Sequence, residues 1–385
     1  MPGYEVIDNE ERKEVDKIFK DGGVLFRHSF NHLRNNSYKV DEFEKKFALK
    51  MGSKYALAVT SGTAALRVAL ATLKLKPGDE VITQSFTFVA TVEAIIESRA
   101  TPVCTEINDT LNMDPSDLIK KISSKTKAVI VVHMLGVPAE IGKIKKICKK
   151  NNLILIEDTA WGCGGKINKK YLGTIGDIGT YSFDFAKTIT TGEGGMILFK
   201  NKKSYEYAKA WHDHGHENNP RVPRWEDTRK SSGFNYRMTE MQAAVGIVQL
   251  KKLDNIIKMQ RENRSKIFNE IKDLDGIDFR KMPNFSFDSA DALIFFTENK
   301  LKALKCRNSL IKSGLTTKIL PEATTWHFAK EWTHMPELKQ IKNKNAFNSS
   351  KRLLDRSVSI PINVNMQNKI PKKIKTAIEG ILKKS

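Results

Sequence analysis

A lysine between a serine and a glycine-rich turn is the residue of this sequence best suited to covalent chemistry. Lys187 follows Ser182 by five positions and precedes Gly192, Gly194 and Gly195. Apolar runs on both sides, residues 178–183 and 196–199, predict two buried strands that place this loop. An amine in such a sheltered place can form a Schiff base with a carbonyl group. The alternative is a surface lysine, the default in a chain with 65 Lys and Arg residues.

Two other loops carry groups that complement an amine. Residues 60–63, Thr-Ser-Gly-Thr, connect a predicted strand to a predicted helix, so their N–H groups and the helix N-terminus suit a phosphate. Asp158 directly follows a buried strand and suits a cationic ligand nitrogen; its alternative role is a cap on the next segment. Because ligands of parallel sheets bind beyond the carboxyl ends of the strands, the three loops are expected to converge.

A phosphate cradle, a carboxylate and a lysine together fit pyridoxal 5′-phosphate (PLP). Residues 60–63 and Ser182 would take the phosphate, Asp158 the pyridinium nitrogen and Lys187 the aldehyde. Phe88, at the start of a predicted helix, is placed to stack on the ring, with plain core packing as its alternative.

The elements that position these groups alternate between strand and helix from residue 55 to residue 157. This order predicts an α/β fold, with a mainly parallel central sheet and helices on both faces. A long helix over residues 239–265 is expected to lead into a smaller α+β domain. The predicted division is a large PLP-binding domain at 1–250, with an N-terminal arm at 1–40, and a small C-terminal domain at 251–385.

Six segments carry a resemblance to a known family. They are residues 60–66, 77–82, 86–91, 157–158, 182–195 and 233–238, and in this order they resemble the DegT/DnrJ/EryC1/StrS family of PLP-dependent sugar aminotransferases. The resemblance runs from near residue 10 to the end of the chain. It implies the type I aminotransferase fold, PLP as cofactor and a homodimer with shared active sites.

The resemblance also assigns roles to single residues. Lys187 corresponds to the catalytic Schiff-base lysine and Asp158 to the partner of the pyridine nitrogen. The remaining cofactor residues implied are Gly62, Thr63, Phe88, Trp161, Ser182 and Asn235. Asn235 corresponds to an asparagine that reaches the phosphate in the neighbouring subunit, and Arg237 either supports this contact or braces the loop.

Two positions depart from the family pattern. Trp161 stands where many members have Gln or His near the cofactor's hydroxyl, and an indole can only donate a hydrogen bond. Asp184 stands where many members have His. The first departure puts the ring contacts in doubt, and the second the local loop geometry.

A narrower resemblance concerns the substrate. Residues 1–5, 26–35, 213–216 and 326–338 resemble bacterial 8-amino-3,8-dideoxy-manno-octulosonate aminotransferases, which act on a free acidic sugar for lipopolysaccharide. The substrate residues predicted from these segments are His28, Arg34, His214, His216 and His327. Each histidine has a structural or surface role as its alternative.

The overall composition argues against three other kinds of protein: nucleic-acid-binding, metal-binding and membrane-spanning proteins. The formal charge of +21 raises the possibility of a nucleic-acid ligand, but the lysines are spread along the chain and lack an interleaved aromatic pattern. The four cysteines form no CxxC pair, so no metal site is predicted. No apolar run reaches the roughly 20 residues of a membrane span and no signal peptide is visible, so a cytoplasmic location is expected.

The predicted reaction moves an amino group from L-glutamate to a keto or aldehyde sugar, with 8-oxo-3-deoxy-manno-octulosonate as the best candidate. The first alternative is a nucleotide-sugar aminotransferase acting on a 3-keto or 4-keto sugar. The more remote alternative is a non-catalytic, PLP-binding regulatory protein. Dehydratases of the family carry histidine in place of the lysine, so Lys187 disfavours that branch.

Overall fold

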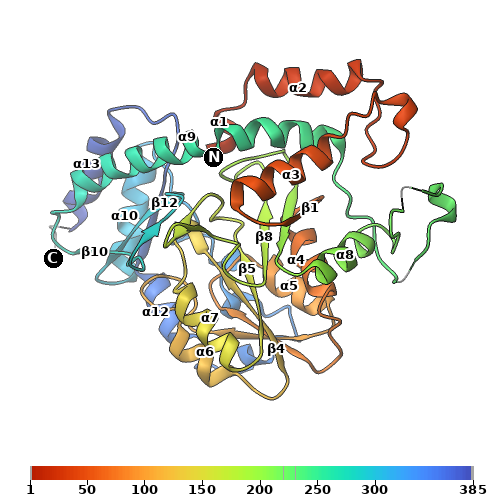
Figure 1. Cartoon of the computed structure of the whole chain (residues 1–385). Coiled ribbons are helices and arrows are strands. Elements are labelled where there is room, and N and C mark those ends of the chain that lie inside the picture. The colour runs from red at the N-terminus through yellow and green to blue at the C-terminus, as the bar shows by residue number, and fades with distance from the viewer. Residues whose placement is uncertain (1, 220, 230, 383–385) are drawn as a thin grey trace.

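A seven-stranded sheet forms the centre of the large domain in the computed structural model, which describes residues 2–219, 221–229 and 231–382 (Figure 1). The strand order is β1-β9-β8-β5-β4-β2-β3. β9 is antiparallel to both of its neighbours, and the other pairs are parallel. The predicted mainly parallel sheet is confirmed. The strands are β1 (Tyr55–Val59), β2 (Glu80–Gln84), β3 (Thr101–Thr105), β4 (Thr126–Val132), β5 (Ile154–Asp158), β8 (Ile178–Ser182) and β9 (Gly195–Phe199).

Alternate residues of β4 show that both faces of the sheet are covered. Ala128 and Ile130 pack into the core under α4, α5 and α8, whereas Val129 and Val131 pack into the core under α6 and α7. A continuous apolar strand is what a parallel sheet between two helical layers requires. The helices are α4 (Gly62–Ala71), α5 (Ala90–Glu97), α6 (Pro115–Lys121), α7 (Ile141–Lys150) and α8 (Lys202–Trp211).

The N-terminal arm lies across the helix α9 on the outside of the large domain (Figure 1). Its helices are α1 (Pro2–Glu5), α2 (Asn9–Lys20), the 3-10 turn η1 (Asn31–Leu33) and α3 (Lys39–Met51). Asp8 and Glu11 form a capping box that starts α2. Glu11 also accepts hydrogen bonds from Gln249 and Lys252 of α9, so the arm is fixed to the large domain.

Helix α9 (Glu240–Ile271) starts one residue after the predicted position and extends six residues beyond the predicted end. Thr239 and Gln242 form its capping box. The predicted domain boundary at residue 250 falls inside this helix. Two buried side chains of α9 lie in different cores: Ile247 packs in the core of the large domain and Ile267 in that of the small domain.

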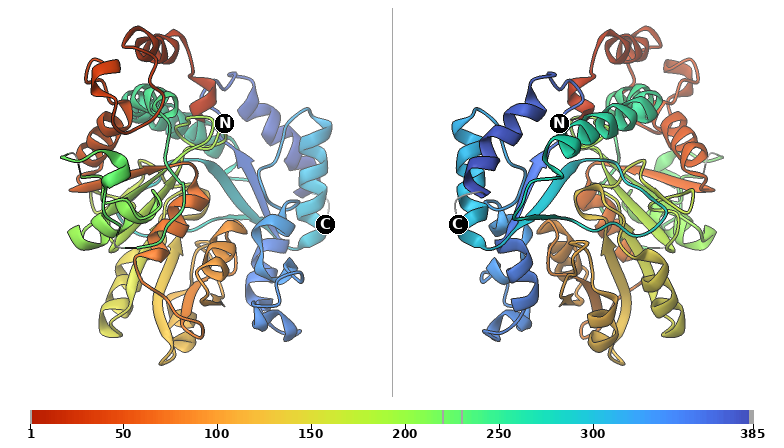
Figure 2. Two further views of the ribbon diagram at one scale, coloured as in Figure 1. Left: turned by 90° about the vertical axis from the view of Figure 1, so that its right-hand side faces the viewer. Right: turned by 90° about the vertical axis from the view of Figure 1, so that its left-hand side faces the viewer.

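The small domain is built on the antiparallel sheet β10-β12-β13, which α10 and α13 cover (Figure 2). Its elements are β10 (Ile277–Phe279), β12 (Ala292–Thr297), α10 (Lys300–Lys312), β13 (Ser357–Pro361) and α13 (Ile370–Leu382). A further small sheet joins β11 (Ser286–Phe287) to β6 (Lys166–Ile167) and β7 (Lys170–Tyr171).

One part of the predicted small domain packs against the large domain. It contains α11 (Thr324–His327), two 3-10 turns, η4 (Ala329–Glu331) and η5 (Lys339–Lys342), and α12 (Asn348–Asp355). Phe328 forms an isolated bridge with Phe86, and Ser350 donates a hydrogen bond from its side chain to Glu106. Trp332 is fully buried in the same core as Phe86. The predicted division at residue 250 assigned this segment to the small domain. Its contacts with the large domain were not foreseen, because they join residues more than 200 positions apart in the sequence.

All four cysteines are buried and free. Burial raises the pKa of Cys104, Cys148 and Cys163 to about 12 and that of Cys306 to about 11. Within the described residues, no helix is both long and apolar enough to cross a membrane, and no cluster of three His, Cys, Asp or Glu side chains suits a metal ion.

Candidate active site

Lys187 lies in the connection between β8 and β9. Backbone hydrogen bonds hold this loop: Phe183 N–H donates to the Gly194 carbonyl at 2.8 Å and Lys187 N–H to the Asp184 carbonyl at 3.0 Å. The Lys187 carbonyl accepts from Gly3 N–H of α1 at 3.1 Å. The N-terminal arm therefore fixes the backbone of the lysine from outside the sheet.

A cavity of about 320 Å³ opens at the carboxyl ends of the parallel strands, and Lys187 lines it. Most of the predicted cofactor residues line it too, together with one predicted substrate residue: Gly62, Thr63, Phe88, Asp158, Trp161, Ser182 and His327. The convergence of the three loops, expected from the strand–helix alternation, is thus found in the structure.

Burial and neighbouring charge lower the pKa of Lys187 to about 8. Burial is the largest cause, and the charge of Lys318 acts in the same direction. Asp291, Asp184 and Asp158 oppose this shift. An amine with this pKa is partly unprotonated near neutral pH, and so is prepared for attack on a carbonyl carbon.

Asp158 is the most buried of the carboxylates that line the cavity, with Asp184 and Glu193 the more exposed ones. Its side chain accepts hydrogen bonds from the Ala160 N–H and the Thr91 hydroxyl, both at 3.1 Å. Burial raises its pKa, although these hydrogen bonds and the charge of Lys187 act against the rise. A buried carboxylate without a fixed cation in contact is a fitting partner for a protonated ring nitrogen.

The adjacent Glu157 points elsewhere and serves the fold. It lies 3.0 Å from His133 and accepts N–H bonds from Gly173 and Gly176. Burial alone would raise the pKa of Glu157, but His133 and these N–H groups hold it below its usual value. Strand alternation therefore gives one acid of the pair to the site and one to the core.

The N-terminus of α4 packs directly against Ser182, and both line the cavity. Ser61 caps the helix, and its hydroxyl accepts from Ala64 N–H at 3.0 Å, which leaves earlier N–H groups for an anion. A Cβ at position 62 would lie 2.7 Å from Cβ of Ser182, so glycine is required there. The donor set and its spacing fit a phosphate group.

Aromatic rings form the walls of the cavity. The Lys187 ammonium lies 3.5 Å from the centre of the Trp161 ring. Phe88 is 39% exposed, which argues against the core-packing alternative, and its ring is parallel to that of Trp326 at 6.3 Å. The ring of His327 lies 5.3 Å from that of Phe88 and 6.4 Å from that of Trp161. These flat surfaces fit a pyridine ring, so the residues present match PLP.

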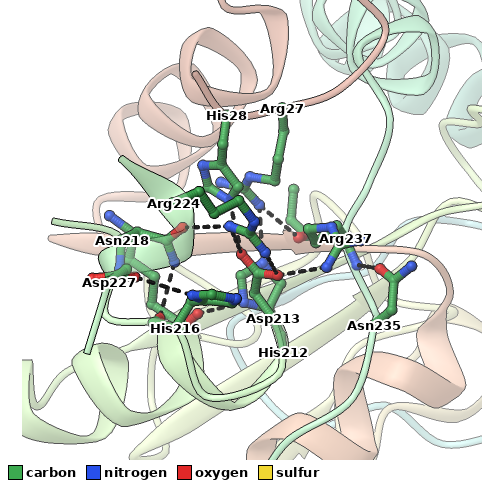
Figure 3. A network of polar contacts seen from close by, with 12 residues as sticks. Arg27, His28, His212, Asp213, His216, Asn218, Arg224, Asp227, Asn235 and Arg237 are labelled. Atoms are coloured by element: carbon green, nitrogen blue, oxygen red, sulfur yellow. Dashed lines mark hydrogen bonds and ion pairs between the residues drawn. The ribbon is translucent and has the colours of Figure 1, made fainter. Parts of the chain in front are cut away.

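The other predicted residues do not line the cavity of this chain. His28, His216, Asn235 and Arg237 lie instead around Asp213 (Figure 3). Asp213 pairs with Arg224 and Arg237, and His28 Nε2 lies 3.4 Å from its carboxylate. We use the name Asp213 network for the residues labelled in Figure 3: Arg27, His28, His212, Asp213, His216, Asn218, Arg224, Asp227, Asn235 and Arg237.

Charge pairing in the Asp213 network is extensive. Burial raises the pKa of Asp213, but the hydrogen bonds and charges of the two arginines outweigh burial and hold it well below its usual value. Burial and the charge of Arg27 lower the pKa of His28 to about 2 and that of His212 to about 3. The two histidines are therefore neutral at pH 7.

Two predicted substrate residues have other surroundings. Arg34 pairs with Glu240 at 2.8 Å, donates to the Phe26 and Ser37 carbonyls at 2.7 and 2.8 Å and lies over the Tyr38 ring. These contacts bind the arm to α9. His214 is exposed at a backbone φ of 53°.

Three residues near the reactive lysine were not predicted from the sequence. Thr91 supports Asp158, and Lys318 and Asp291 approach from the small domain. Thr91 lies in a segment that the family resemblance covers, so a signal for it existed. Lys318 is one of many lysines and had no such signal.

Comparisons with known proteins agree with this geometry. The DegT/DnrJ/EryC1/StrS aminotransferase family matches residues 16–379. A "GDP-perosamine synthase" of Escherichia coli O157:H7 is 42% identical over 58% of this chain and 60% of its own length. A "putative pyridoxal phosphate-dependent aminotransferase" of Bacillus subtilis is 36% identical over 64% of each chain. The solved aminotransferase of Psychrobacter cryohalolentis is 26% identical, with a TM-score of 0.85 over 97% of both chains.

Proposed function

The chain belongs to the DegT/DnrJ/EryC1/StrS aminotransferase family, and we propose that it transfers an amino group from L-glutamate to the carbonyl carbon of a free acidic sugar. The family confirms the predicted sugar aminotransferase class, and the relative named as pyridoxal phosphate-dependent confirms the predicted cofactor. The proposed acceptor is 8-oxo-3-deoxy-manno-octulosonate, and the product is 8-amino-3,8-dideoxy-manno-octulosonate. The proposed location is the cytoplasm.

One observation carries the proposal: Lys187 and Asp158 line one cavity together with the N-terminus of α4. When bound there, PLP supplies an aldehyde for amines and a ring that accepts electrons from a breaking bond. The N–H groups at Gly62 and Thr63, with the Ser182 hydroxyl, bind its phosphate. Asp158 holds the proton on its ring nitrogen.

Lys187 acts on protons as well as on the carbonyl group. Its Nζ would take the proton from the α-carbon of the amino donor and deliver it to the carbon of the cofactor that carries the nitrogen, and the second half-reaction would run these transfers in reverse. Positioned proton transfer of this kind contributes typically about 10²–10⁴-fold. The wall of Trp161 and Phe88 limits the movement of the ring and keeps water from the amine.

A homodimer with shared sites gives the remaining predicted residues their roles in this proposal. Asn235 is exposed and reaches the phosphate in the neighbouring subunit, with Arg237 and Asp213 bracing its loop. His28, His214 and His216 then face the partner's sugar, and Arg34 orders the arm that carries His28. Exposed apolar side chains of the same region support a covered face: Phe30 is 48%, Leu33 51% and Phe234 54% exposed.

His327 is the substrate residue within the chain's own cavity. Its Nδ1 lies 2.9 Å from the Ala323 carbonyl, so Nδ1 is the donor and Nε2 is free to accept a hydrogen bond. Burial lowers the pKa of His327 to about 4. A neutral imidazole in this position suits a sugar hydroxyl.

A nucleotide sugar with a 3-keto or 4-keto group is the second candidate acceptor. It is favoured by the relatives named GDP-perosamine synthase. A non-catalytic, PLP-binding role is the third candidate, and it has no support from the cavity.

An amine-transfer assay separates the three candidates. Purified enzyme with PLP is given glutamate and, in turn, 8-oxo-3-deoxy-manno-octulosonate, GDP-4-keto-6-deoxymannose and a UDP-linked 4-keto sugar. We expect 2-oxoglutarate and an aminated product with the octulosonate. Amination of the nucleotide sugars alone would replace this acceptor with the second candidate. A visible absorbance band that glutamate does not shift would leave only the third.

A further inference from the structure

Two lysines from different domains approach the same indole ring. The Lys187 ammonium lies 3.5 Å from the centre of the Trp161 six-and-five-membered ring system, and the Lys318 ammonium lies 4.9 Å from it. Lys187 and Trp161 belong to the large domain, whereas Lys318 follows α10 of the small domain. The reactive amine is therefore close to a second cation that the small domain supplies.

Lys318 is fixed in this position. Its ammonium pairs with Asp291 at 2.6 Å, and its backbone N–H donates to Ser359 of β13 at 2.9 Å. Asp291 is 2% exposed and immediately precedes β12. The carbonyl of Asp291 accepts from Ile362 N–H at 3.3 Å, so both members of the pair are anchored to the small-domain sheet.

The second carboxylate oxygen of Asp291 is buried without a hydrogen-bond partner among the described residues. A buried carboxylate is stable only near cations. Lys318 is one such cation, and Lys187 is another within electrostatic range. Asp291 therefore acts on both amines, more strongly on the one that it contacts.

We propose that the Lys318–Asp291 pair, held against Trp161, is a positioning element that sets the protonation state of the Lys187 amine. Lys318 repels a proton from Lys187, while Asp291 favours one. The pair touches neither substrate nor cofactor in this role. This proposal rests on the proposed function in one respect, namely that Lys187 is the lysine that binds PLP.

The other charged groups around Lys187 come from every element packed against it. Asp158 ends β5, Asp184 precedes the lysine in its own loop, and His327 of α11 is neutral at pH 7. These carboxylates favour the charged amine, so burial and Lys318 must account for its lowered pKa of about 8. Lys318 is the one cation among these neighbours.

The origin of the pair gives this arrangement a further property. Lys187 responds to two groups that are anchored to β12 and β13, across the domain junction. Any movement that separates the two domains would remove Lys318 from the indole ring and make Lys187 easier to protonate. The amine is then most reactive when the domains are together.

The test is a pH titration of the visible absorbance of the PLP-loaded enzyme, without any sugar. Lys318→Met removes the repulsion, and we expect the midpoint to rise by about one pH unit, which is a tenfold change in protonation. Asp291→Asn keeps the hydrogen bond to Lys318 but removes the negative charge, so the midpoint should fall. Lys318→Arg keeps the charge and should stay within a few tenths of a unit of the wild type.

A second readout uses the protein without cofactor. The rate at which trinitrobenzenesulfonate labels Lys187, followed by mass spectrometry across pH, should shift in the same directions. Lys330→Met serves as the matched control, because Lys330 contacts Lys344 and Asn348 instead of the active site. If Lys318→Met does not fold, the double variant with Asp291→Asn replaces it and should show a smaller rise.

Opposite shifts for the two single variants support the proposal, because loss of structure would not give opposite signs. Unchanged midpoints in folded Lys318→Met, or shifts in one common direction, would overturn it. Absence of any PLP absorbance band in the wild type would instead overturn the proposed function. The two failures are thus distinguishable.

Discussion

The cavity at Lys187 and the Asp213 network both contain several charged side chains, but they use charge in opposite ways. In the Asp213 network, Asp213 is paired with two arginines and its pKa is held low. In the cavity, Asp158 has a raised pKa and Lys187 a lowered one, and neither forms an ion pair with another residue that the structure describes. Complete pairing stabilises a fold, whereas incomplete pairing leaves groups ready to react.

Replacing the amine should give the largest effect. Lys187→Ala should reduce amine transfer by more than about 10⁴-fold, because the nucleophile and the proton carrier are lost together. The free energy of unfolding should not fall, since the cation that is removed is half-buried and pairs with no carboxylate among the described residues. Transamination assays and urea unfolding measure the two quantities. Lys202→Ala, at an exposed position, is the control. Near-normal turnover of Lys187→Ala would show that Lys187 is not the reactive amine.

The Asp213 network should respond in the reverse manner. Asp213→Asn removes the common partner of two arginines from a site where its side chain is fully buried. We expect unfolding to become easier by roughly 3–5 kcal/mol. Urea unfolding tests this, with Asp254→Asn at an exposed ion pair as the control. A loss below about 1 kcal/mol would show that pairing in the network is not structural.

Acid should weaken the fold through histidines that stay neutral. The pKa of His28, His212 and His327 is lowered by burial to about 2, 3 and 4. The unfolded chain takes up these protons below pH 6.5, so stability is complete above that pH and declines as the pH falls toward the folded values. The loss should reach up to about 2 kcal/mol per histidine at pH 5.

Unfolding at pH 7.5, 6 and 5 measures this decline. His212→Asn and His327→Asn should each flatten the dependence by a similar amount, because both folded pKa values lie well below pH 5. A stability that does not change between pH 7.5 and 5 would contradict the assignment.

The smallest predicted effect concerns the cavity wall. Phe88→Leu removes a flat ring beside the cofactor and should weaken PLP binding by about 1 kcal/mol, or roughly fivefold in Kd. Titration of the unloaded enzyme with PLP tests this. Phe185→Leu is the matched control, because the Phe185 ring is exposed and does not line the cavity. Equal effects in both variants would show that Phe88 does not contact the cofactor.

The sequence predicted the large domain and its cavity well because both depend on local patterns. Apolar runs such as residues 55–59 and 153–157 predict strands, and the residues that follow each run are expected at one edge of the sheet. Gly62, Asp158 and Lys187 were expected at that edge for this reason, and all three line the cavity found there.

Contacts across long sequence separations were not predicted. Lys318 approaches Trp161 because its backbone is hydrogen-bonded to β13, which pairs with β12, and Ser350 reaches Glu106 because the segment at 324–355 returns to the large domain. Nothing in the local pattern around either residue encodes such a partner. The local pattern around Asp213 likewise does not show that it pairs with Arg224 and Arg237, because the fold of a polar loop brings these side chains together.

The four buried cysteines have a practical consequence for watching the two domains move. Thiol reagents require an accessible thiolate, and burial with a raised pKa denies both conditions at every native cysteine. Cysteines introduced at the exposed Leu49 of α3 and Leu301 of α10 would react far faster than the native ones. Fluorophores attached at these two points would report the distance between the domains during turnover, with no native residue to be removed first.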